Sequence, residues 1–332
     1  TLAKQHYENF KKLFAETRVN ISLLTGSLHK EERNRVLSDL ATGTTDIVIG
    51  THALFSKDVN YAYLGLVVID EQHKFGVNQR ASLLDKGEHA DLLLMSATPI
   101  PRTLAFTIYG DLDVSTLSQF PQGKRNVITR LIPENDPLVD SLIKKSLSSQ
   151  HRVYIVAPQI EGDGKQNTSA IKIAEMYRKK YGDKVTLCHG KLDEESKETS
   201  ILSFQSGLTP IMVATSLVEV GIDVKEADLM IIYSPSHFSL SSLHQLRGRV
   251  GRGGEEAHCL LLYSKKDESE NEKLRVLEKE DDGFKIAEED MRLRGPGEMA
   301  GTRQSGLPTF GVASIMDDFK IFEVARDDAR KM

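Results

Sequence analysis

Cysteine is scarce in this 332-residue sequence, which contains only Cys188 and Cys259. Each cysteine lies inside an apolar run, and neither belongs to a Cys-x-x-Cys pair. This pattern argues against a metal or redox role and predicts two buried thiols in a reducing cytosol. His73 and His189 also lack a second residue at the spacing of metal ligands.

Long apolar runs are missing as well. No stretch approaches the roughly 20 residues that a membrane-spanning helix needs, and the first residues do not resemble a signal peptide. The net charge of −5 averages over all faces, so it neither supports nor excludes nucleic acid as a partner. Acidic residues are concentrated in stretches such as the one from Lys265 to Asp290, which we expect to be helical and exposed to solvent.

A third absence concerns phosphate binding. The sequence has no GxxxxGK[ST] string, the glycine-rich loop that cradles nucleotide phosphates in many ATPases. The nearest string, residues 162–166, lacks the hydroxyl residue and the upstream glycine, and we interpret it as a polar loop.

The sequence does contain a regular alternation of short apolar runs and amphipathic stretches of helical length. The runs lack apolar–polar alternation, which predicts strands buried on both faces in a parallel sheet covered by helices. They fall at residues 46–50, 66–70, 92–96, 153–157, 185–188, 211–214, 229–233 and 259–263. The predicted fold class is therefore α/β.

An internal duplication sets the expected architecture. The segment that starts at Leu23 matches the segment that starts at Leu187 without a gap, at an offset of 164 residues. The matched positions include Gly26 with Gly190, Gly43 with Gly207, Thr51 with Thr215, Leu28 with Leu192, Leu37 with Ile201 and Leu40 with Phe204. The shared apolar face and the terminal glycine predict the same strand–helix–strand unit in two similar lobes.

The domain boundaries follow from this duplication and from local composition. Residues 119–125 combine proline, glycine and charge, as expected of a linker. We therefore predict a first lobe at residues 1–120, a second lobe at 121–265, and a small helical and loop element at 266–332.

The lobes differ at the end of their third strand, where the first has Asp70-Glu71 and the second has Ser234-Pro235. A strand-end Asp is placed to hold Mg²⁺ through water, and the adjacent Glu can polarise the water that attacks a γ-phosphate. We expect His73, in the same DEQH string, to couple the nucleotide site to the second lobe by hydrogen bonding. One asymmetric site between related lobes suits a clamped nucleotide, whereas the alternative is an acidic turn.

Small hydroxyl residues close the next strand. Ser96 and Thr98, in the string SAT, can hydrogen-bond the carboxylates and relay their state to the other lobe, although a simple strand turn is the alternative. Gly221 and Asp223, in VGIDV, offer a flexible turn with a carboxylate that we assign to nucleotide binding.

Hydroxyl residues also recur in the duplicated segments. Thr51-His52 and Thr215-Ser216 are equivalent, and their hydroxyl and backbone N–H groups can contact DNA phosphates without reading the base sequence. Two such contacts, one per lobe, would let the lobes walk along a strand. The alternative for each is a helix N-cap.

Arginine clusters in the string QLRGRVGR of the second lobe, which contains Gln245, Arg249 and Arg252. We expect Arg249 and Arg252, three residues apart, to lie on one helical face, with glycines that allow close approach. Guanidinium groups suit the charge that develops on a transferring phosphoryl group, in the manner of an arginine finger. The alternative is a basic helix end at the surface.

These strings together resemble a known class of motor proteins. DEQH, SAT followed by PRTL, VATSLVEVGIDV and QLRGRVGR resemble, in order and spacing, motifs two, three, five and six of superfamily-two helicases. The strings DEQHKFGVNQR, SATPIPRTLAFTIYGDLDVSTL and RGPGEMAGTRQSG are similar to those of the bacterial RecG helicases, and the resemblance covers nearly the whole chain.

The resemblance implies two RecA-like parallel-sheet lobes in tandem, followed by a small C-terminal helical and loop translocation element. It implies a double-stranded-DNA translocase that uses ATP and Mg²⁺ to remodel stalled forks and branched junctions. Asp70, Glu71, Gln245, Arg249 and Arg252 would then be catalytic. Arg303 and Gln304 would communicate with DNA or with the second-lobe arginines, and Arg102 would contact DNA.

The expected partners are forked and branched duplex DNA and a single-stranded-DNA-binding protein. The resemblance further implies a monomeric motor, cytoplasmic and nucleoid-associated in a bacterium, with no membrane partner. In the family the phosphate-cradling loop and an N-terminal wedge domain precede the position of Thr1, so we expect a fragment that is inactive alone. Two alternatives stay open, a transcription-repair coupling translocase and a non-catalytic nucleic-acid-binding remnant.

Overall fold

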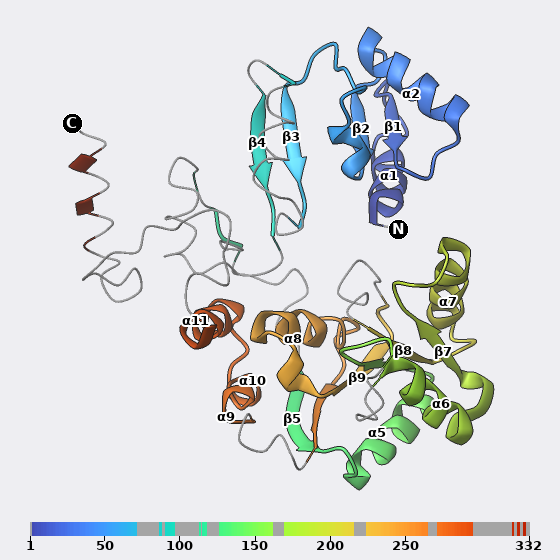
Figure 1. The fold of residues 1–332 in the computed structure, drawn as a ribbon, viewed down its shortest axis with the longest axis vertical. Coiled ribbons are helices and arrows are strands. Elements are labelled where there is room, and N and C mark those ends of the chain that lie inside the picture. The colour runs from blue at the N-terminus through green and yellow to red at the C-terminus, as the bar shows by residue number, and fades with distance from the viewer. Residues whose placement is uncertain are drawn as a thin grey trace. The chain divides into compact units, whose positions relative to one another are not determined.

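The computed structural model describes residues 2–71, 86–87, 90–96, 113, 115–117, 126–161, 169–215, 224–264, 271–294, 321, 324–325 and 328–329. The chain divides into two compact units, Thr1–Ala97 and Thr98–Met332 (Figure 1). Among the described residues, no helix combines the length and the apolar character that crossing a membrane requires.

The first unit contains two parallel strand pairs within its described part. Its elements are α1 (Leu2–Leu13), β1 (Ile21–Leu24), α2 (Lys30–Thr42), β2 (Ile47–Gly50), η1 (His52–Phe55), β3 (Leu66–Ile69) and β4 (Asp91–Leu94). Strand β1 pairs with β2, and β3 pairs with β4. Leu24, Val36, Leu40 and Val59 form a buried cluster between β1 and α2, so the apolar face of the helix packs against the strand.

The second unit is built on a six-stranded parallel sheet with the strand order β5-β10-β9-β6-β8-β7. Its strands are β5 (Val127–Pro133), β6 (Arg152–Val156), β7 (Val185–Cys188), β8 (Ile211–Ala214), β9 (Ala227–Tyr233) and β10 (Ala257–Tyr263). Its helices are α5 (Pro137–Ser148), α6 (Ala170–Tyr181), η3 (Gly182–Lys184), α7 (Glu194–Ser206), η5 (Pro235–His237), α8 (Leu240–Arg247), α9 (Asn271–Leu274), α10 (Val276–Lys279) and α11 (Gly283–Arg294).

Helices cover both faces of this sheet, as the uninterrupted apolar runs predict. Along β6, Val153 and Ile155 pack with α5 and α6 in one core, whereas Tyr154 and Val156 pack with α7 and α8 in the other. All eight strands predicted from apolar runs are present, and both cysteines are buried as expected. The α/β prediction is therefore confirmed.

The predicted duplication is confirmed element by element. Strand β1, helix α2 and strand β2 have the bounds of β7, α7 and β8 when 164 is added to each residue number. The strand pairing keeps this offset too, because Ile21 faces Ile47 and Val185 faces Ile211. Gly43 and Gly207 end the two helices with φ angles of 76° and 82°, a left-handed conformation in which glycine avoids steric strain.

The stretch between Lys265 and Asp290 is helical in its described part and most of its described acidic residues are exposed or half-buried, but it is not solvated on all sides. Leu274, Leu277 and Ile286 join the core of the second unit, and Asp290 is only 3% exposed. The high charge of this stretch predicts exposure to solvent. Its few apolar residues are nevertheless enough to pack three short helices against the core of the second unit. Glu278 of α10 also accepts a hydrogen bond from the Leu131 N–H at 2.8 Å, which satisfies part of the free edge of β5.

Candidate nucleotide and DNA site

The predicted acidic pair lies directly after β3. The Asp70 Oδ1 atom accepts a hydrogen bond from the Glu71 N–H at 2.8 Å, and Glu71 has a φ angle of 51°. This left-handed conformation is costly for a residue with a side chain, and such strain is found preferentially at functional sites. The turn therefore places both residues at the carboxyl end of a parallel strand, where ligands bind in α/β sheets, and its hydrogen bond orients the Asp70 carboxylate.

A residue from the first helix faces this pair. The His6 Nε2 atom of α1 lies 3.5 Å from Asp70 Oδ2, and the two side chains are 40% and 37% exposed. Sequence reasoning missed His6, because 64 residues separate it from Asp70 and no motif joins them. The contact leaves the partly exposed carboxylate accessible to a ligand while restricting its orientation.

The donor set of the acidic turn fits Mg²⁺, which prefers hard oxygen ligands and retains several waters. Asp70 offers a half-exposed carboxylate with one oxygen already oriented by the Glu71 N–H group. Among the described residues, no group of three or more His, Cys, Asp or Glu side chains is arranged as a protein-only metal site. A single carboxylate therefore suits an ion that is held mainly through water and nucleotide phosphates.

Ser96 is brought to the same sheet edge as Asp70. Strands β3 and β4 are parallel neighbours with Ile69 opposite Leu94, and the Met95 N–H donates to the Ile69 carbonyl at 2.8 Å. The two strands thus end side by side. The proposed coupling role of Ser96 stays a prediction.

Thr51 and His52 follow β2 at the start of η1. Thr51 is exposed and its side chain makes no capping hydrogen bond, which weakens the alternative that it serves as a helix N-cap. Gly50 is required just before it, because a Cβ atom there would lie 2.2 Å from the Leu24 carbonyl oxygen. Close approach of β2 to β1 therefore sets the position of Thr51.

Lys86 holds the turn that follows η1. Its Nζ atom donates to the carbonyl oxygens of Ser56 and Val59, both at 2.7 Å. Burial lowers the pKa of the Lys86 ammonium group, and the nearby Asp58 carboxylate opposes this shift. No sequence motif signals this anchor, which positions the segment after the predicted DNA contact.

Thr215 is the counterpart of Thr51 at the end of β8, but its environment differs. Only 6% of Thr215 is exposed, whereas Thr51 is exposed. The duplication therefore preserves the backbone at these positions and does not preserve side-chain accessibility.

The predicted arginine site lies at the end of α8 in the second unit. Gln245 is in the last turn of α8, which ends at Arg247, so Arg249 and Arg252 follow the helix. The expectation that both arginines share a helical face is wrong. Gly251 adopts a φ angle of 74°, and its N–H donates to the Ala227 carbonyl at 3.0 Å instead of continuing the helix. We call residues 248–256 the arginine loop.

Two buried charged residues hold α8 at both ends, and sequence reasoning identified neither role. At the N-terminus, the Asp290 carboxylate of α11 accepts hydrogen bonds from the N–H groups of Leu240 and Ser241 at 3.2 and 3.3 Å. At the C-terminus, Arg247 Nη1 donates to the Leu277 and Glu280 carbonyl oxygens at 3.0 and 2.9 Å.

Burial lowers the pKa of the Arg247 guanidinium group, but its ordinary value is so high that the group stays charged. Carbonyl acceptors and the Asp281 carboxylate at 3.6 Å compensate this buried charge. The helix that leads into the arginine loop is thus fixed by the segment between Leu277 and Asp290.

Several predicted site residues lie outside the described part of the chain. They are His73, Thr98, Arg102, Ser216, Gly221, Asp223, Arg303 and Gln304. Their assignments stay predictions.

Comparison with known proteins gives three family matches along the chain. Residues 1–106 match the DEAD/DEAH box helicase family, and residues 135–254 match the helicase conserved C-terminal domain. Residues 280–332 match the family described as ATP-dependent DNA helicase RecG, domain 3, C-terminal. The third match separates this chain from helicases that share only the two lobes. The chain belongs to the RecG family.

Whole-chain similarity agrees with this assignment. An ATP-dependent DNA helicase RecG from Streptococcus pneumoniae is 44% identical over 98% of this chain and 49% of its own length. RecG from Thermotoga maritima is 44% identical over 100% of this chain and 43% of its own length. The chain thus spans about half the length of these RecG relatives.

A solved structure described as RecG bound to a three-way DNA junction is also similar. It has a TM-score of 0.74 and 41% sequence identity, and the match covers 97% of this chain and 42% of that chain. The parallel-sheet architecture expected from the sequence is therefore that of a RecG helicase.

Proposed function

We propose that this chain is the motor segment of an ATP-dependent translocase on double-stranded DNA that remodels stalled forks and branched junctions. The observation that carries the proposal is the division of charge between the two units. The first unit ends β3 with Asp70 and Glu71, and the second presents Arg249 and Arg252 after α8. Similarity to a RecG structure in complex with a DNA junction supports DNA as the partner.

In this proposal each side chain has one task. Asp70 would hold Mg²⁺ through water, and Glu71 would orient and deprotonate the attacking water. Arg249 and Arg252, with Gln245 beside them, would stabilise charge on the phosphoryl oxygens. ATP and Mg²⁺, when bound, supply the phosphoanhydride bond and the charge compensation for its cleavage.

DNA contacts are assigned to groups that read the backbone. Thr51 and His52 in the first unit are exposed after β2 and would bind phosphates. Thr215 follows the equivalent strand of the second unit but is only 6% exposed, so a phosphate contact there would require local rearrangement. Contacts to phosphates do not depend on the base sequence, which suits a motor that moves along any duplex. The finer expectations, a monomer near the nucleoid that meets a single-stranded-DNA-binding protein, belong to this proposal.

The family match at residues 280–332 favours this function over transcription-repair coupling, because its description names RecG. Retention of both the carboxylates and the arginines argues against a non-catalytic remnant, since binding alone would not require them.

The proposal is tested by ATP hydrolysis on forked DNA. Because the sequence has no GxxxxGK[ST] string, the assay uses a protein in which this chain follows such a loop. Glu71→Gln and Arg252→Ala should each lower kcat by about 1,000-fold or more, since both groups act on the transition state. DNA affinity should change less than about two-fold, as neither residue is assigned to phosphate contact.

The exposed residues Glu16 and Arg275 provide matched controls. Glu16→Gln and Arg275→Ala remove the same charges at exposed positions that have no assigned role in the site, and they should leave kcat unchanged. Near-normal hydrolysis in Glu71→Gln or Arg252→Ala would remove that residue from the catalytic site.

A further inference from the structure

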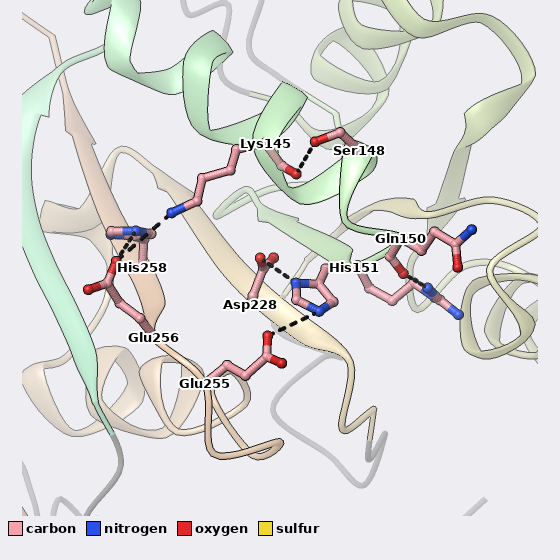
Figure 2. A network of polar contacts seen from close by, with 9 residues as sticks. Lys145, Ser148, Gln150, His151, Asp228, Glu255, Glu256 and His258 are labelled. Atoms are coloured by element: carbon pink, nitrogen blue, oxygen red, sulfur yellow. Dashed lines mark hydrogen bonds and ion pairs between the residues drawn. The ribbon is translucent and has the colours of Figure 1, made fainter.

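His151 bridges two carboxylates on different segments of the second unit (Figure 2). Its Nδ1 atom lies 2.8 Å from Asp228 at the start of β9, and its Nε2 atom lies 3.3 Å from Glu255 in the arginine loop. His151 itself precedes β6, where its N–H donates to the Ser146 carbonyl at 2.8 Å. One ring thus joins the α5–β6 turn, β9 and the loop that carries Arg249 and Arg252.

The two contacts differ in strength. The side chains of His151 and Asp228 are 24% and 18% exposed, so their hydrogen bond is shielded from water. Glu255 is 72% exposed, and its pairing energy alone is small. The hydrogen bond with Asp228 therefore fixes the orientation of the His151 ring. The ring nitrogen that faces Glu255 is then held in one position. Each of the two ring nitrogens therefore faces one carboxylate oxygen.

Two adjacent glycines lie in the part of the loop that Glu255 restrains. Gly253 and Gly254 separate Arg252 from Glu255, and Gly254 has a φ angle of 85°. A pocket of about 180 Å³ lies between this part of the loop and residues 225–228. Side chains therefore do not fill the space on this side of the loop, and glycine allows more backbone conformations than other residues.

Arg252 stands between two attachment points. Before it, the Gly251 N–H donates to the Ala227 carbonyl at 3.0 Å. After it, Glu255 meets His151. Both attachments lead to the start of β9, since Ala227 and Asp228 are adjacent. A loop fixed on both sides of Arg252 loses less conformational freedom when the guanidinium group engages a ligand.

We infer that His151 is a positioning residue that, through Asp228 and Glu255, fixes the arginine loop for catalysis. The tether itself is a property of the second unit. Its catalytic consequence rests on the proposed function, in which Arg252 stabilises the transition state.

Glu256 supplies a matched control beside Glu255. Its carboxylate lies 3.4 Å from His258 and 4.0 Å from Lys145, and neither partner belongs to the tether (Figure 2). Glu255→Gln and Glu256→Gln therefore remove the same charge from adjacent positions, and only the first weakens the contact with His151.

The first experiment measures hydrogen–deuterium exchange in the arginine loop of the chain as it stands. His151→Ala and Glu255→Gln should raise amide exchange at residues 252–255 by about three-fold or more, because loop opening becomes easier. Glu256→Gln should not. Since His151→Ala also leaves Asp228 without its partner, Glu255→Gln tests the tether if His151→Ala unfolds. Unchanged exchange in Glu255→Gln would overturn the tether.

The second experiment measures ATP hydrolysis in a protein where the chain follows a phosphate-binding loop. Glu255→Gln should lower kcat by about three- to ten-fold with KM for ATP unchanged, because the arginine acts on charge that develops in the transition state. His151→Gln, which retains one donor for Asp228, should show the same loss. Unchanged kcat together with faster exchange would overturn the catalytic role. Absence of hydrolysis in the unsubstituted protein would instead overturn the proposed function, and the exchange data would still decide the tether.

Discussion

His6 shows how a single contact can tune the acidic turn. Its Nε2 atom faces Asp70 Oδ2 at 3.5 Å, while the Glu71 N–H occupies Oδ1. Groups that orient a metal-binding carboxylate commonly influence metal affinity without touching the ion. If Asp70 holds Mg²⁺ as proposed, His6 is placed to orient its carboxylate.

The effect of His6 can be measured through Mg²⁺ dependence. His6→Ala should raise the Mg²⁺ concentration needed for half-maximal ATP hydrolysis by about 10-fold or more. The reason is that Asp70, the proposed metal ligand, loses the side chain that orients it. His29→Ala provides the control, because His29 makes no side-chain capping hydrogen bond at the start of α2. An unchanged Mg²⁺ requirement in His6→Ala would contradict this role.

A second histidine makes the second unit sensitive to acid. Burial lowers the pKa of the His258 imidazole, Lys145 and Arg130 add to this shift, and Glu256 and Asp228 oppose it. In the unfolded chain the ring binds a proton near its ordinary pKa of about 6.5. Below that pH the unfolded state takes up the proton first, so the free energy of unfolding falls as the pH drops.

Urea unfolding at several pH values tests this expectation. Between pH 7.5 and about 5, the midpoint should fall less in His258→Gln than in the parent, because the titrating group is gone. His237→Gln, at an exposed position, should behave as the parent. Equal pH dependence in parent and His258→Gln would refute the contribution of His258.

At the scale of elements, α8 is the helix on which the second unit concentrates its buried charge. Asp290 accepts hydrogen bonds at its N-terminus, and Arg247 donates to carbonyl oxygens after its C-terminus. The negative carboxylate also complements the positive end of the helix dipole. Helices α10 and α11 thereby fix the orientation of the helix that leads to Arg249 and Arg252.

Removal of the Asp290 carboxylate should destabilise the second unit. Asp290→Ala leaves the buried Leu240 N–H without its acceptor, which we expect to lower the free energy of unfolding by about 1–3 kcal/mol. Glu289→Ala, one residue earlier, removes a surface ion pair with Arg292 at 3.8 Å and should cost less than about 0.5 kcal/mol. Urea unfolding followed by circular dichroism distinguishes them. Equal stability of the two variants would show that Asp290 does not hold α8.

At the scale of the whole molecule, the two copies of a duplicated scaffold contribute opposite charges. The first copy carries the carboxylates of Asp70 and Glu71, and the second is followed by the guanidinium groups of Arg249 and Arg252. The paired elements β1–α2–β2 and β7–α7–β8 have equivalent bounds, yet only the first unit has the carboxylate pair. In the proposed function, catalysis would require groups from both units. Loss of either group should then abolish the same step.

A double substitution tests this dependence. If Glu71 and Arg252 serve one transition state, Glu71→Gln combined with Arg252→Ala should lower kcat little more than either change alone. The measurement is single-turnover ATP hydrolysis with forked DNA. Losses that multiply across the two substitutions would show that the residues act independently.

The sequence by itself determined the repeated framework. Apolar runs without alternation located eight strands. Burial on both faces holds for β6, β8, β9 and β10, whereas residues of β3 and β4 alternate in exposure, so the expectation is wrong for these two strands. The glycines Gly43 and Gly207 located two helix ends, since a left-handed cap favours glycine. Edge strand β5, which is only half-buried, was not predicted because its residues carry no comparable signal.

Only the tertiary structure decided which distant groups meet. The contacts of His6 with Asp70, of Asp290 with α8 and of His151 with Glu255 join residues that no motif links. It also decided that Arg249 and Arg252 lie in a loop, because Gly251 directs its N–H to a neighbouring strand. Local sequence encodes backbone preference and burial, whereas pairing of charged side chains depends on how the elements pack.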